Sequence, residues 1–161
     1  MKMTPFGHPR DTERGVFMIE QDTIRLLREC DAGIKMGIAS IEDVQDHVEH
    51  TQMRKHLSRC KEEHEALQDE VAGQLDRFQD RGKDPNPIAK GMSWMKTTMK
   101  LGMEESDRMI ADLMTDGCNM GVKSLGKYLN QYKAADETSK DIAKRLIKLE
   151  EQLAVQMRAY L

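Results

Sequence analysis

One small group of side chains in this sequence could do chemistry. His64 lies in the apolar stripe of a predicted helix, and Cys60 stands one helical turn before it. Glu150, much later in the chain, flanks the apolar stripe of another predicted helix. If both His64 and Glu150 point inward they need one another, because an unpaired buried charge is costly. The residues therefore predict a structural polar pair, or a His64 whose ring is satisfied by a backbone carbonyl, with a metal or proton site of His64, Glu150 and a water as the alternative.

A transition-metal site is a second alternative at the same place. Cys60 and His64, together with Met36 or Met120, offer the sulfur and imidazole ligands that copper(I) or zinc accepts. Nothing in the sequence supplies two further obvious thiolates, and no Gly-rich phosphate loop or Ser-His-Asp order is present. We expect no catalytic residues and no cofactor, with a transition metal as the alternative.

Four amphipathic segments must position these residues. Apolar side chains recur at spacings of three and four from Asp22 to Val48, Met53 to Phe78, about Glu104 to Tyr132, and Thr138 to the C-terminus. Asp22 is expected to be the N-cap of the first segment. Short polar breaks join the first segment to the second and the third to the fourth. The pattern predicts an all-α fold, an antiparallel four-helix bundle of two helical hairpins over residues 21–161. Residues 1–20, rich in Pro and Gly, are expected to form a flexible arm.

The stretch between the hairpins, about residues 88–101, predicts a crossover helix with two apolar faces. Trp94 and Leu101 project away from a methionine-rich stripe. That second face would need a partner, so we expect Trp94 and Leu101 at an interface with the arm or with another subunit. A homo-oligomer follows, with a dimer as the expected form. Four lysines in and beside this stretch leave a membrane-surface role as an alternative.

An internal repeat links the first and third predicted helices. The pattern G-x-x-M-G-[IV]-x-S-[IL] begins at Gly33 and again at Gly117, with its second glycine at Gly37 and Gly121. A mid-helix glycine costs up to about 1 kcal/mol relative to Ala, so two such pairs indicate a packing use. We expect the first and third helices to cross closely there. The functional alternative is a bare floor that admits a small ligand or metal.

Charge and composition bound the remaining possibilities. The net charge is -3, so no global positive field favours nucleic acid as a partner. Three widely spaced cysteines are typical of a reducing compartment. The sequence has no run of about 20 apolar residues that could span a bilayer, and no stable membrane insertion is expected. These features predict a cytoplasmic protein.

The two hairpins joined by a long crossover resemble the ferritin-like superfamily. The order of Cys30-Asp31-x-Gly33, a second helix ending near Gly82, and the segment from Ile88 to Trp94 is similar to a bacterial ferritin-like family of unknown function. The resemblance implies a duplicated hairpin and suggests a role in stress physiology. Di-iron members use inward glutamates and a Glu-x-x-His motif, but this chain has no Glu-x-x-His and places Met-Gly at mid-helix.

The function predicted from sequence is therefore non-catalytic. We expect a ferritin-like bundle with a degenerate metal site, acting as a structural or protein-interaction module. The alternative is a metal-binding or redox protein with an atypical centre near Met36, His64, Met120 and Glu150.

Overall fold

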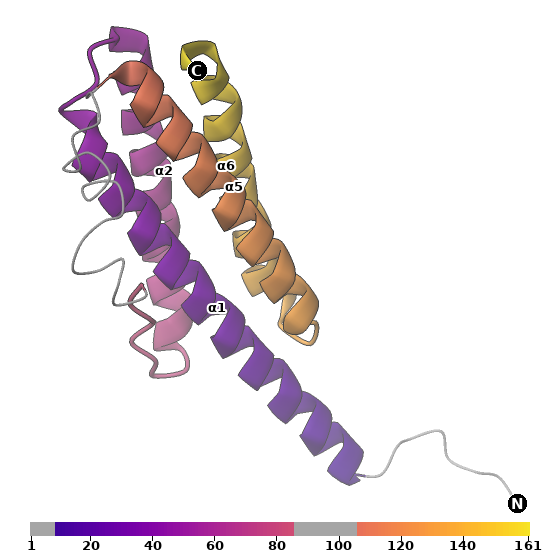
Figure 1. The fold of residues 1–161 in the computed structure, drawn as a ribbon. Helices are drawn as coiled ribbons and strands as arrows, with labels where there is room; N and C mark the ends of the chain where they lie inside the picture. The colour runs from indigo at the N-terminus through magenta and orange to yellow at the C-terminus, as the bar shows by residue number, and fades with distance from the viewer. Residues whose placement is uncertain (1–8, 86–105) are drawn as a thin grey trace, which may run out of the picture.

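The structure, a computed structural model, describes residues 9–85 and 106–161. All regular secondary structure within these ranges is helical, and the prediction of an all-α fold is confirmed. Four helices dominate (Figure 1): α1 (Pro9–Gln45), α2 (Thr51–Asp76), α5 (Asp107–Gln131) and α6 (Glu137–Met157), followed by a short 3-10 helix, η1 (Arg158–Tyr160). The predicted crossover helix, with Trp94 and Leu101, lies outside the described residues. None of the described helices is both long and apolar enough to cross a membrane.

The first helix is longer than the sequence predicts. It begins at Pro9, so residues 9–20, expected to belong to a flexible arm, are helical. Proline is tolerated in the first turn, where the N–H groups have no intrahelical partner, and Gly15 weakens a helix without ending it. This part of α1 projects past the ends of the other helices (Figure 1). Its side chains at 16–19, Val-Phe-Met-Ile, are exposed.

Asp22, expected to cap the first helix, instead bonds to the turn between α5 and α6. Its carboxylate accepts the N–H of Ala134 at 3.0 Å, and the neighbouring Thr23 hydroxyl accepts the N–H of Asp136 at 2.8 Å. These two bonds serve backbone donors that the turn leaves without a helical partner. They fix the α5–α6 turn against the middle of α1.

The other end of α5 is fixed in the same way. Both oxygens of Asp107 accept backbone N–H groups, of Glu49 and His50, at 2.9 Å each. Ser106 caps α5 by accepting the N–H of Met109. The carboxylate of Asp107, in the first turn, also interacts favourably with the positive end of the helix dipole. The start of α5 is therefore held against the α1–α2 turn, and its end against α1.

The apolar core is divided into two clusters. One contains Ile41, Leu57, Ile110 and Leu153 among others, and the other contains Ile34, Leu67, Leu125 and Leu146 among others. Each helix contributes to both clusters, and on each helix the nearest buried residues of the two clusters stand seven positions apart, which is about two turns. The positions within these gaps form a layer, which we call the mid-core layer: Gly37, His64, Gly121 and Glu150. One residue of this layer comes from each helix.

Candidate functional site

The expected polar pair is present in the mid-core layer. His64 on α2 is 2% exposed, and its Nε2 lies 3.4 Å from Oε1 of Glu150 on α6. The other ring nitrogen, Nδ1, lies 2.8 Å from the carbonyl oxygen of Cys60. A carbonyl only accepts, so Nδ1–H donates to Cys60. Nε2 is then the atom whose protonation decides whether His64 and Glu150 form an ion pair.

The surroundings of His64 favour its charged form. Burial lowers the pKa of the imidazole, but side-chain hydrogen bonds to Cys60 and Glu150, followed by the electrostatic effects of the same two residues, outweigh burial. The net effect raises the pKa of His64 from 6.5 to about 10. At neutral pH the ring is therefore an imidazolium that donates from Nε2 to the Glu150 carboxylate.

The repeated glycines make room for this pair. A Cβ added to Gly37 would lie 2.8 Å from His64 Nε2, and one added to Gly121 would lie 3.1 Å from Glu150 Oε2. The sequence predicts close packing of two helix backbones at these glycines. In the structure, the atoms nearest to Gly33, Gly37 and Gly121 are instead side-chain atoms of α2 and α6. At Gly33 the nearest is Leu146, at an ordinary contact distance of 3.8 Å.

The same glycines open a groove between α1 and α5. The groove has a volume of about 540 Å³, and all four glycines of the repeat line it. His64 and Glu150 lie at its floor, and both methionines of the repeat, Met36 and Met120, also line it. Its size is in the ordinary range for small-molecule sites, which are mostly apolar with a few polar groups. We call this feature the α1–α5 groove.

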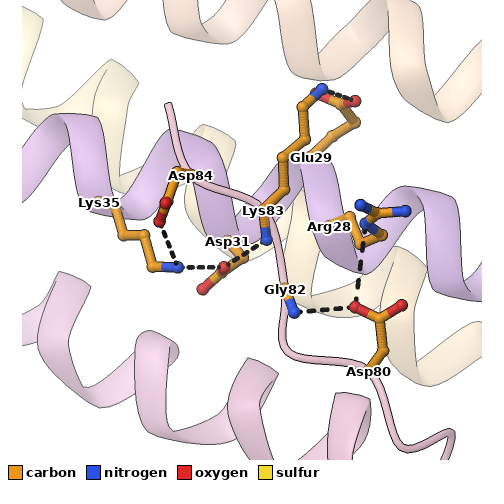
Figure 2. Close-up of polar contacts among 8 residues, drawn as sticks. All are labelled: Arg28, Glu29, Asp31, Lys35, Asp80, Gly82, Lys83 and Asp84. Carbon is orange, nitrogen blue, oxygen red and sulfur yellow. Dashed lines mark hydrogen bonds and ion pairs between the residues drawn. The ribbon is translucent and has the colours of Figure 1, made fainter. Parts of the chain in front are cut away.

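One rim of the α1–α5 groove is formed by the chain that follows α2. Lys83, Asp84 and Pro85 line the groove, and Figure 2 shows how Lys83 and Asp84 are held. Asp31 on α1 is 5% exposed and accepts both the backbone N–H of Lys83, at 2.9 Å, and the ammonium of Lys35, at 2.7 Å. Lys35 also pairs with Asp84 at 3.6 Å.

Gly82 is essential to this arrangement. Its φ is +85°, a conformation that side chains disfavour, and an added Cβ would collide with the Asp31 carboxylate. Its N–H donates to Asp80 at 2.8 Å (Figure 2). Gly82 thus lets the chain turn tightly against α1, so that the next three residues reach the rim of the groove.

The cysteines near the site are buried thiols. Burial and the charge of Glu150 raise the pKa of Cys118 well above its usual range. Burial, then the charges of Glu29 and Asp31, raises the pKa of Cys30 to about 12. Cys60 Sγ lies 3.5 Å from His64 Nδ1. Since the thiolate is the nucleophile and metal ligand, protonated Cys30 and Cys118 behave as small apolar residues.

The residues of the mid-core layer do not fit a di-iron centre. Such a centre needs carboxylates from all four helices, whereas α1 and α5 present Gly37 and Gly121. The remaining His64 and Glu150 bind each other. Among the described residues, no three His, Cys, Asp or Glu side chains are grouped so that they could hold a metal ion. The structure also leaves Met120 63% exposed, in the lining of the groove rather than in the core.

The comparisons with known proteins identify no relative. No protein-family model, no curated protein and no solved structure matches the chain.

Sequence reasoning located the floor of the site but missed its rim. His64, Glu150 and the glycine repeat were identified from helical spacing. Asp31 was noticed only within the Cys-Asp-x-Gly motif, and its contact with Lys83 joins positions far apart in the sequence. A charged residue on the buried side of α1, next to Cys30 and Ile34, was the available signal that Asp31 had a buried partner.

Proposed function

We propose that this protein is a non-catalytic binding module that holds a small ligand in the α1–α5 groove. The observation that carries the proposal is the mid-core layer. Each of two helices places a glycine where a side chain would fill the space, and the other two helices direct His64 and Glu150 into it. The result is an apolar groove with a polar floor, which is the usual composition of a ligand site.

A purely structural role explains the groove less well. A core gains stability from filled volume, and glycine in mid-helix costs up to about 1 kcal/mol at each position. A Cβ added to Gly33 would meet only Leu146, at 3.8 Å, so this glycine accommodates neither member of the polar pair. The absence of a side chain at Gly33 is explained if a ligand occupies the open volume of the groove that Gly33 lines.

We further propose that the four helices form an antiparallel four-helix bundle of ferritin-like architecture. Cross-helix contacts support the antiparallel direction of α1 and α2: Gln45 bonds to Ser58, Glu42 pairs with Lys61, and Gly37 lies nearest to His64. Along these three contacts the residue numbers decrease on α1 as they increase on α2, which is the order of an antiparallel pair. Within this architecture the His64–Glu150 pair occupies the place of a metal centre.

Ligand binding is tested with two substitutions at neighbouring residues, one that blocks the groove and one that leaves it open. Ser40 lines the groove, whereas Ala39 is exposed and does not. A set of small amphipathic fragments is titrated while backbone amide shifts are followed by NMR. Binding should shift amides around residues 33–40 of α1 and 117–124 of α5. Ser40→Phe should abolish these shifts, and Ala39→Phe should leave them unchanged.

Two results would refute this proposal. One is that no fragment shifts the amides of the groove. The other is that Ala39→Phe and Ser40→Phe affect binding equally, which would place the site elsewhere.

A metal-binding function is the second candidate, since Met36, His64, Met120 and Glu150 all line the same groove. Elemental analysis after anaerobic incubation with iron, zinc and copper(I) separates the two functions. A binding module for organic ligands should retain no stoichiometric metal. Stoichiometric metal that is lost in His64→Ala would favour the metal site.

A further inference from the structure

We infer that the ligand of the α1–α5 groove is a small apolar molecule with a single amine group, whose ammonium donates to the Glu150 carboxylate. This inference rests on the proposed function, and it names the chemical class that the same site would select.

The first argument is the acceptor capacity of Glu150. A carboxylate has about four acceptor sites. Oε1 of Glu150 faces His64 at 3.4 Å, and Oε2 faces Gly121, whose missing side chain leaves the approach open. The Cys118 thiol is a further neighbour. Since the side chain is 12% exposed and lines the groove, part of its acceptor capacity is directed toward a ligand.

The second argument is the balance of charge around the groove. The described lining contains three carboxylates, Glu29, Asp84 and Glu150, and two cations, His64 and Lys83. Each of these cations has a carboxylate partner: Glu150 for His64 and Glu29 for Lys83. The three carboxylates are paired as well, Asp84 with Lys35. A carboxylate can accept from a second donor, so an ammonium can share one without displacing its partner, whereas an anionic ligand would have to displace a carboxylate from a cation. The electrostatics of the groove therefore favour a cation.

The third argument concerns the rest of the ligand. The walls above Glu150 include Met36, Ile41, Leu125 and Leu153, so most of the ligand's surface would lie against apolar side chains. A volume of about 540 Å³ accommodates an aryl or alkyl body and a compact head group. A bare metal ion would make no contact with these apolar walls. A polyamine would place several charges against them, which is unfavourable.

Three probes with the same apolar body test the head group: phenylpropylamine, phenylpropanol and phenylpropanoate. Each is titrated at neutral pH into the full chain, and dissociation constants are taken from the amide shifts of the groove. The hydroxyl of the alcohol can also donate to the Glu150 carboxylate, but only the ammonium adds an opposite charge, which makes its hydrogen bond markedly stronger. The amine should therefore bind roughly tenfold to a hundredfold more tightly than the alcohol. The carboxylate should bind most weakly.

Glu150→Gln should make the amine and the alcohol bind equally, while Glu151→Gln, an exposed neighbour, should preserve the preference. The probe series on the unmodified chain decides the question even if Glu150→Gln fails to fold. Equal binding of the three probes in the groove, or tightest binding of the carboxylate, would overturn the amine assignment and keep the binding module. Absence of all binding in the groove would overturn the proposed function itself.

Discussion

Replacing Gly37 with alanine should destabilise the protein, although alanine is the better helix former. The Cβ would lie 2.8 and 2.9 Å from His64 Nε2 and Cδ2, so the ring must move. Cys60 holds that ring at 2.8 Å, and any movement separates it from Glu150. Breaking a buried pair costs about 3–5 kcal/mol, and the alanine returns up to about 1 kcal/mol, so the net loss should be about 2–4 kcal/mol.

Three other glycines provide matched controls in the same helices or their neighbours. A Cβ at Gly33 makes an ordinary contact, and nothing lies within 4 Å of one at Gly73 or Gly126. Each of these changes to alanine should raise stability by up to about 1 kcal/mol. Urea denaturation followed by circular dichroism measures all four variants. Equal stability of Gly37→Ala and Gly33→Ala would refute the reasoning, because it would mean that the His64 ring does not need the space left by Gly37.

Three further predictions concern the rim, the charged pair and a helix cap. Gly82→Ala should cost at least about 1–2 kcal/mol in urea denaturation, since Ala is strained at positive φ and its Cβ meets Asp31; a neutral effect would contradict the described turn. The raised pKa of His64 gives stability that is complete below pH 6.5 and lost as pH rises toward about 10, so the stability difference between the wild type and His64→Gln should shrink over that range. A constant difference would argue against the ion pair. Asp136→Ala removes the side chain that caps α6 and should cost about 1 kcal/mol, measured by thermal melting, whereas no change would show that the cap is dispensable.

Helical periodicity predicted the four long helices because each of them carries a clear apolar stripe. The ends of α2, α5 and α6 lie within a few residues of the predicted ends. The predicted start of α1, at Asp22, was wrong. The Pro and Gly residues before it were expected to break the helix, but the helix begins at Pro9 and continues through Gly15 without packing against other elements. Asp22 was misread as a cap because its true partner, Ala134, is distant in sequence.

The candidate site could be predicted only in part. His64 and Glu150 were paired from their depth along the helices, which helical geometry fixes. The purpose of the glycines could not be settled from spacing, since the repeat fits both close helix packing and an open groove. The rim at Gly82 depends on a loop conformation and a long-range bond to Asp31, and neither has a periodic signal.

A charged His64–Glu150 pair forms the floor of the α1–α5 groove. NMR of the His64 ring nitrogens across pH 5 to 8 tests it most directly, with His64→Gln identifying the signal. The account predicts that both ring nitrogens stay protonated over the whole range, because the pKa of His64 is raised to about 10. A ring that titrates with a midpoint at or below 6.5 would show a neutral His64 and contradict the account.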